Sequence, residues 1–283
     1  MMKTKSFEEI HNRAQAAFQG IQLVFEFMDQ YQSSVMGVIV RNEFVHRENV
    51  LKLLWVRSLS WVKTLSILNH SSSFQAISAA NRSLLEISID LVLLHTDKTN
   101  DLGWKMFWFT ESELLKDAEL ITNYFSDKKI EIPTTFEDSQ GFIKQKKDSI
   151  ETMRKSLWKT TKHPKCRWTG SSDLSIDAKK ADSQFAAGIG GDLQMGFDEY
   201  YQTAYRKLNW DIHSGGTALV NNTMEFVDTK NFLRLIHCAN FAILCTRLIL
   251  TDLEVTQHLN DIDEKIENLT LERGLLILEA SSS

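Results

Sequence analysis

The stretch AANRSLLEISIDLVLLH, residues 79–95, is the part of the sequence that says most about the fold. Its second half is almost entirely apolar and is interrupted only by Glu86, Ser88 and Asp90. Arg82, Glu86 and Asp90 recur every fourth residue, so on a helix they form one narrow polar stripe. A helix that is apolar on its other sides needs neighbours around it. We therefore expect this helix to lie at the centre of a helical bundle.

Helix-breaking residues are rare in the rest of the chain, because only two of the 283 residues, Pro133 and Pro164, are prolines. No run of alternating apolar and polar residues indicates a strand. These patterns predict an all-α protein, a multi-helix up-and-down bundle that forms a single domain over residues 1–283. The expected helices cover residues about 7–31, 35–69, 74–97, 100–126, 136–161, 193–214, 229–250 and 253–277.

Three segments are expected to depart from a simple bundle. Residues 99–165 predict two helices separated by the IPTT turn at 132–135, and we expect them to form a helical hairpin inserted into the bundle. Residues about 163–191 contain Pro, Gly and Ser with weak periodicity, which predicts an irregular surface connection that includes one short helix at most. Residues about 253–283 predict a charged C-terminal helix at the periphery of the fold.

The composition indicates a soluble, cytoplasmic protein. A formal net charge of −5 argues against a protein that coats nucleic acid without specificity, although a local basic patch could still bind it. The three cysteines make no disulfide framework and indicate free thiols in a reducing compartment. The first residues have no apolar core, so no signal peptide is expected. The apolar run at 232–250 contains Arg234, His237 and Arg247, which are costly inside a bilayer, so it predicts a buried helix.

The stretch YRKLNWDIHSGG, residues 205–216, combines residue types that can carry chemistry. On a helical wheel of residues 193–214, one side holds a set of core residues: Phe197, Tyr201, Ala204, Leu208 and Ile212. The opposite side holds polar residues and an indole: Arg206, Asn209 and His213, with Gln202 and Trp210 beside them. A tryptophan on a polar face predicts that this face contacts another molecule.

Arg206 and His213 lie two helical turns apart, and their side chains suit one reaction. An arginine can bind a phosphate with two hydrogen bonds and stabilise developing charge. A histidine with a pKa near neutrality can transfer a proton. Together they suit attack of an RNA 2′-hydroxyl on its own phosphodiester, which needs no metal. The alternative is structural: Arg206 pairs with an acid, and His213 caps carbonyl groups near the helix end.

The polar stripe of the helix at 74–97 offers partners to these two residues. Arg82 and Glu86 can pair within their own helix. Glu86 or Asp90 could also meet Arg206 or His213 and orient the histidine. The alternative is an ion-pair network that serves only the fold.

A di-metal site is a further alternative. Glu8–His11 and Glu43–His46 repeat the Glu-x-x-His step with which some helical bundles bind two metals, and Glu86 is one well-placed additional acid. Solvated helix charges explain the same steps, and we expect no metal or other cofactor. Similarly, the cationic region at 144–167 could meet RNA phosphates or form a solvated helix face.

The RSLLE helix at residues 82–86, followed by a tyrosine-rich helix that ends in a histidine, resembles a bacterial family of uncharacterised all-helical proteins. That family is similar to the HEPN superfamily, many of whose members are toxin or antiphage ribonucleases. Their signature is an Arg, four to six residues and a His, which here matches Arg206, KLNWDI and His213. The wider resemblance covers about residues 35–250.

The resemblance implies a HEPN-like helical core with a metal-independent site. In that site Arg206 would bind the phosphate, His213 would transfer the proton, and Asn209 would orient one of them. HEPN sites form where two protomers meet, so the resemblance also implies a homodimer that acts on RNA in a toxin or antiphage system.

Neighbouring residues are expected to contact RNA or a partner: Tyr205, Lys207 and Trp210. HEPN enzymes often have Asn, Asp or His directly after the Arg, where this chain has Lys207. Some HEPN-like proteins bind partners and cut nothing. The alternative is therefore a non-catalytic helical interaction module whose partner is encoded in the same operon.

Overall fold

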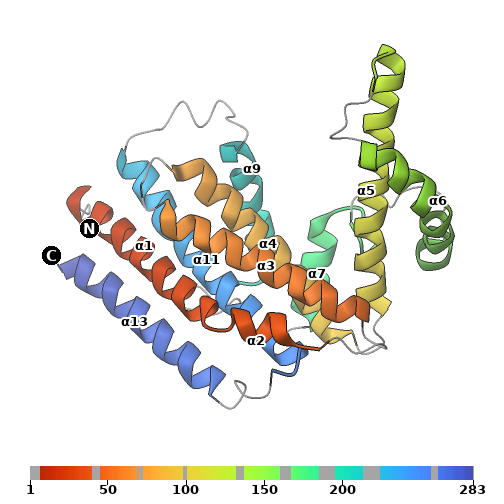
Figure 1. Cartoon of the computed structure of the whole chain (residues 1–283). Coiled ribbons are helices and arrows are strands. Elements are labelled where there is room, and N and C mark those ends of the chain that lie inside the picture. The colour runs from red at the N-terminus through yellow and green to blue at the C-terminus, as the bar shows by residue number, and fades with distance from the viewer. Residues whose placement is uncertain are drawn as a thin grey trace.

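A computed structural model describes residues 7–39, 45–68, 70, 73–97, 101–131, 137–159, 167–184, 195–212, 224–255 and 261–282, without the side chains of 45–46, 137–139, 210 and 224–226 (Figure 1). These residues form helices and contain no β-strand, which confirms the predicted all-α bundle. The helices are α1 (Phe7–Asp29), α2 (Gln32–Gly37), α3 (Val45–Ile67), α4 (Phe74–Thr96), α5 (Asp101–Lys128), α6 (Glu137–Trp158), α7 (Leu174–Gln184), α8 (Phe197–Tyr200), the π-helical η4 (Tyr201–Tyr205), α9 (Arg206–Ile212), α11 (Met224–Asp252) and α13 (Ile262–Ser282).

Helix α4 lies at the centre, as its sequence predicts. It packs against α3, α7, α9 and α11, so neighbours cover several of its sides. Leu84, Leu85, Leu91 and Leu94 are fully buried, like most of the apolar residues of this helix. Burying a leucine side chain contributes about 2 kcal/mol, so this helix provides a large part of the stability of the fold.

The helices are layered around α4. The outermost helix, α13, contacts α1, and α1 contacts α3 and α11 (Figure 1). Helices α3 and α11 in turn contact α4, and the other sides of α4 contact α7 and α9. Over Val227–Asp252, α11 is long and apolar enough to cross a membrane by length and composition alone. However, 67% of its most apolar window is buried inside the bundle. In this fold α11 is therefore a core helix.

Helices α5 and α6 form a hairpin that projects from the bundle, at the place expected for an insertion (Figure 1). Lys146 and Lys147 of α6 pair with two acids of α5 at N–O distances of 3.4 and 3.2 Å: Glu111 and Glu119. Buried Arg154 donates from Nε to Oγ of Ser112 at 2.6 Å. Part of the cationic region at 144–167 thus holds the hairpin together instead of lying free.

The segment at 163–191 contains one short helix, as expected, but this helix packs more closely on the bundle than a surface connection would. Where it is described, from 167 to 184, it consists of a turn followed by α7, and α7 packs against α4. Trp168 is only 3% exposed, and Ala178 and Ala181 of α7 are fully buried. The segment is drawn inward because it supplies hydrogen-bond donors to a carboxylate of α4, which weak helical periodicity does not reveal.

Helix α13 lies on the outer side of α1, so the C-terminal helix is peripheral, but it begins at Ile262 instead of near 253 (Figure 1). One buried side chain ties it to the core. Arg273 crosses α1 at Gly20, where a Cβ would lie 3.5 Å from the arginine Cγ, and its Nη atoms reach Oδ1 of Asn240 at 3.3 Å. Burial lowers the pKa of Arg273 to about 10.

A charged cluster joins the C-terminal ends of α4 and α11. Nδ1 of His95 lies 2.7 Å from Oδ1 of Asp252, and Nη2 of Arg47 lies 3.2 Å from Oδ2 of the same carboxylate. The hydrogen bond with Asp252 raises the pKa of His95 above its ordinary 6.5, against the opposing effects of burial and of Arg47.

This raised pKa predicts how stability depends on pH. Because protonated His95 is favoured in the folded chain, its contribution is complete below the unfolded pKa of about 6.5 and is lost as pH rises through the folded pKa. We expect His95→Gln to lose stability below pH ~6 and little at pH ~9, measured by urea unfolding across this range. The exposed His70→Gln variant is the control, and an equal loss for His95→Gln at both pH values would contradict the assignment.

Candidate functional site

A π-helical turn, η4, directly precedes α9 and changes which residues face the core. Tyr200 and Tyr205 are both buried although five residues separate them, whereas a regular helix returns to one side after three or four. Tyr201 and Ala204, expected in the core, are only half-buried. A helical wheel at 100° per residue assumes an uninterrupted α-helix. It therefore gives the wrong angle between the side chains before Arg206 and those after it.

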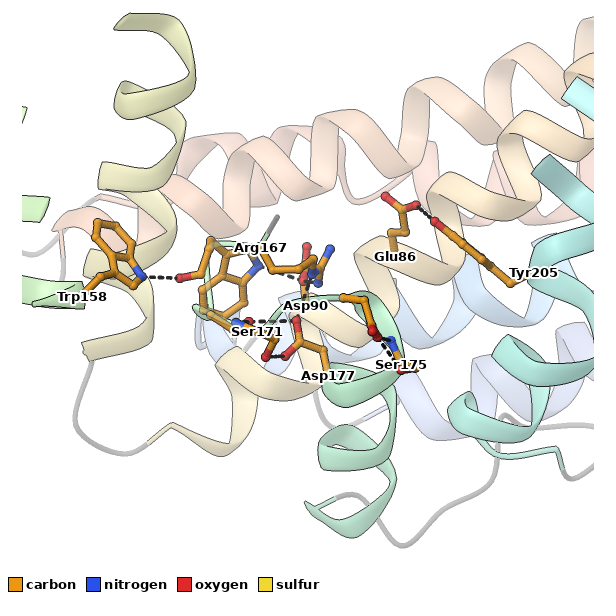
Figure 2. Close-up of polar contacts among 11 residues, drawn as sticks. Glu86, Asp90, Trp158, Arg167, Ser171, Ser175, Asp177 and Tyr205 are labelled. Carbon is orange, nitrogen blue, oxygen red and sulfur yellow. Dashed lines mark hydrogen bonds and ion pairs between the residues drawn. The ribbon is translucent and has the colours of Figure 1, made fainter. Parts of the chain in front are cut away.

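Two side chains after this turn attach the helix to α4. Tyr205 donates its hydroxyl hydrogen to Oε1 of Glu86 at 2.6 Å (Figure 2). Arg82 donates from Nη1 to Oδ1 of Asn209 at 2.7 Å. Arg82 also donates from Nε to Oε1 of Glu86 at 2.9 Å. Burial, and then Glu86, raise the pKa of Tyr205, so this hydroxyl stays protonated and donating at neutral pH. Arg82, Glu86, Tyr205 and Asn209 form what we call the α4–α9 clamp.

The clamp separates the expected site residues into two groups. Asn209 turns toward Arg82, whereas Arg206 and Lys207 are exposed. Tyr205 is buried with its hydroxyl bound to Glu86, which leaves it unsuited to the expected contact with RNA. Among the described residues, the Arg206 guanidinium has no hydrogen bond or ion pair. The side chain of Trp210 and the whole of His213 lie outside the described residues.

Further buried polar contacts anchor both ends of the segment at 197–212. Tyr200 donates to Oδ1 of Asn81 at 2.5 Å, and Asn81 donates to the backbone oxygen of Arg234 at 2.8 Å. Arg234 donates from Nη2 to Asp211 and from Nη1 to Oγ of Ser78 at 2.8 Å. In the sequence Arg234 is a charge within an apolar helix, but a single sequence does not indicate its partners.

Asp90 belongs to a second cluster and does not contact α9. Arg167 donates to Asp90 from Nη2 and to Oδ2 of Asp177 from Nε at 2.9 Å. Trp168 donates from Nε1 to Asp90 at 2.8 Å, and Trp158 of α6 donates to the backbone oxygen of Trp168 at 3.0 Å (Figure 2). Burial raises the pKa of Asp90 to about 6, although Arg167 and Trp168 oppose the shift.

Asp90 therefore does not meet Arg206, whereas a contact with His213 lies outside the described residues. Arg82 and Glu86 of the same stripe do contact the segment that carries Arg206. Asp90 instead holds the turn at 167–173 and, through Trp158, the base of the hairpin.

Of the two Glu-x-x-His steps, the side chains of the first alone lie within the described residues. Nδ1 of His11 lies 3.0 Å from Oδ2 of the buried Asp228. Glu43 and the side chain of His46 lie outside the described residues. Within the described residues, no group of three or more His, Cys, Asp or Glu side chains could hold a metal ion.

The fold defines an all-α bundle whose central helix carries a buried polar stripe. The chain belongs to a family of unknown function, DUF5677, whose family model matches residues 48–231. The match begins in α3 and ends in α11, so α1 and α13 lie outside it. Comparisons with curated proteins and with solved structures found no match. Membership confirms the prediction of an uncharacterised family, and the similarity to HEPN proteins stays a proposal.

The clamp predicts energetic coupling between α4 and α9. Tyr205→Phe and Glu86→Ala remove the two ends of one hydrogen bond, so we expect a coupling free energy of about 1 kcal/mol in a double-mutant cycle of urea unfolding. The same cycle between Tyr205→Phe and Glu267→Ala of α13 is the control and should be additive. Additivity within about 0.3 kcal/mol for the first pair would show that this bond does not stabilise the docked helix.

The second cluster predicts a large loss of stability when its cation is removed. Arg167→Met leaves the buried carboxylates of Asp90 and Asp177 without their arginine, and we expect a loss of about 3–5 kcal/mol in the free energy of unfolding. Arg57→Met, at an exposed arginine of α3, should change the same quantity by less than about 0.5 kcal/mol. A loss as small as that of the control would mean that other groups satisfy these carboxylates.

Proposed function

We propose that the protein is a HEPN-like, metal-independent endoribonuclease that cleaves RNA through attack of a 2′-hydroxyl on the adjacent phosphodiester. Arg206 binds the phosphate and stabilises its developing charge. His213, seven residues further on, transfers the proton. The observation that carries the proposal is the π-helical turn at Tyr201–Tyr205, which ends directly before Arg206, because such turns are frequent at functional sites.

The contacts around this turn give Arg206 the setting that phosphate binding requires. The α4–α9 clamp and the Asp211–Arg234 pair fix the backbone on both sides of the arginine. Its guanidinium stays exposed beside the exposed Lys207, which itself acts electrostatically on Lys230. A fixed backbone with exposed cations favours binding of a polyanion, because little conformational entropy is lost on binding.

The remaining expectations belong to the same proposal. The active species is a homodimer in which two Arg206–His213 faces meet, with Lys207 and Trp210 contacting RNA. Asn209 is a positioning residue that holds α9 on Arg82 through its Oδ1, and its amide group orients Arg206 or His213. The protein acts in the cytoplasm as a toxin or antiphage effector.

A non-catalytic interaction module is the second candidate, and the hairpin favours it. Apolar side chains are exposed toward its tip, and Leu120, Ile121, Tyr124 and Phe125 line a shallow depression on α5. Contiguous exposed apolar side chains of this kind are typical of binding surfaces for other proteins. In this candidate Arg206 contributes to binding only, and the partner is a protein of the same operon.

RNA cleavage in EDTA tests the proposed reaction. We expect wild-type protein to cleave and to leave 2′,3′-cyclic phosphate ends, and His213→Ala and Arg206→Ala to be slower by about a hundredfold or more. The control variants are His70→Ala and Arg57→Ala, which change an exposed histidine and an exposed arginine elsewhere.

Each other result of this assay has a definite meaning. Cleavage that disappears in EDTA and returns with a divalent ion would favour the di-metal alternative. Equal cleavage by all variants would exclude Arg206 and His213 as the catalytic pair. No cleavage of several RNAs by folded wild-type dimer would favour the interaction module.

A further inference from the structure

The outer face of α13 carries an apolar stripe that the other described residues do not cover. Leu271, Leu275 and Leu278 are 66%, 57% and 64% exposed. Their spacing of four and three residues places all three on one side of the helix. Single exposed leucines are ordinary on protein surfaces, whereas three in this spacing form a continuous seam.

This seam is separate from the face that holds α13 in the fold. Ile262, Leu269 and Arg273 are buried on the inner side, toward α1 and the Asn240 side chain of α11. A surface helix needs only one apolar side to stay docked. The outer leucines therefore contribute little to the fold, and their clustering on one exposed side points to a contact with another molecule.

The seam follows the heptad spacing of a helix that pairs with another helix. Continuing the steps of four and three residues in both directions gives Glu264, Asn268, Leu271, Leu275, Leu278 and Ser282. Three leucines over about two helical turns thus lie between polar ends, which limits the contact to a short helical partner. Three of the positions that flank the leucines hold exposed glutamates, Glu267, Glu272 and Glu279, and two hold the uncharged Gly274 and Ser281.

The surrounding surface is acidic because its cations are engaged elsewhere. Lys265 of α13 donates to Asp261 at 2.8 Å, and Arg273 is buried. Helix α1 has no lysine, and its one arginine, Arg13, lies over the ring of Phe232. The exposed charged residues of α1 in this layer, Glu26 and Asp29, are also acidic.

The flanking charges disfavour pairing of α13 with a second copy of itself. In a parallel pair, Glu267 of one copy would lie across from Glu272 of the other. In an antiparallel pair, the glutamates at 272 and 279 would face their equivalents. Like charges in these positions repel and destabilise the pair.

From this combination of an exposed leucine seam and acidic flanks, we propose that the outer face of α13 binds a basic amphipathic helix of another protein. The leucines supply apolar contact, and the glutamates select lysine or arginine on the partner. The site lies across the bundle from α9, so an occupant leaves Arg206 accessible (Figure 1). It also lies outside the family match at 48–231, and it does not depend on ribonuclease activity.

A synthetic peptide of three heptads tests this proposal. It has leucine at the seam positions and lysine at the flanks, and its binding is measured by fluorescence anisotropy at low and high salt. We expect saturable binding that weakens with salt and falls about a hundredfold when Leu271, Leu275 and Leu278 are changed to Ser. Changing Glu267, Glu272 and Glu279 to Gln should remove most of the salt dependence.

Matched controls separate this site from general attraction between a cationic peptide and an acidic protein. Changing the exposed Leu53, Val56 and Ile67 of α3 to Ser should leave binding unchanged. A peptide with glutamate flanks, and a scrambled peptide of the same composition, should not bind. Because the three leucines of α13 are exposed, the Ser variant should keep the wild-type circular dichroism and unfolding midpoint.

Four outcomes would overturn the proposal. The first is no saturable binding of the lysine-flanked peptide, and the second is binding that the leucine changes do not affect. The third is a leucine-dependent dimer in analytical ultracentrifugation, which would make a second copy the occupant. The fourth is leucine-dependent binding to phosphatidylcholine vesicles in place of the peptide, which would make a lipid surface the occupant.

Discussion

The desolvation of polar side chains on α4 is the constraint on which the rest of the structure depends. A buried charge or amide without partners costs several kcal/mol, so every polar group on the central helix must be satisfied by a neighbour. Asn81 binds Tyr200 and the Arg234 backbone, Glu86 binds Tyr205, and Asp90 binds Arg167. Burial of apolar side chains drives the packing of helices around α4, whereas these hydrogen bonds and ion pairs determine the position at which each helix docks.

The same bonds divide the surface of α4 into two zones. In the first zone, Arg82 and Glu86 form hydrogen bonds with the segment that carries Arg206. In the second zone, one helical turn further, Asp90 binds the turn at 167–173, which in turn binds Trp158 of the hairpin. The zones are electrostatically linked, because Glu86 also raises the pKa of Asp90. A change of charge in one zone therefore shifts the pKa values of the other zone without any movement of the backbone.

The sequence predicts the fold more completely than the site. Long runs with helical spacing and only two prolines define the helices, and the apolar character of residues 84–94 correctly identifies the central one. The spacing of Arg82, Glu86 and Asp90 correctly predicts a polar stripe and an Arg82–Glu86 pair. These predictions are correct because they depend on interactions between residues that are close in the sequence.

The errors have a different physical origin. The π-helical turn at 201–205 depends on docking of this segment against α4, and no local residue pattern predicts it. The burial of Trp168 depends on Asp90, which lies 78 residues earlier in the chain. A single sequence gives the identity of such residues but not their pairing, so spacing alone does not predict that Asn209 binds Arg82, that Tyr205 binds Glu86 or that Asp90 binds Arg167.

The pairing of Asp90 with residues far downstream has a consequence for the order in which the chain is made. During synthesis α4 leaves the ribosome before Arg167, Trp168 and Arg234 exist, so the carboxylate of Asp90 and the amide of Asn81 have no protein partners to replace water. The nascent helix must stay hydrated or protected until Arg234 of α11 has been synthesised. The bundle consequently closes late in translation, and chains that stop early leave their most apolar helix exposed to aggregation.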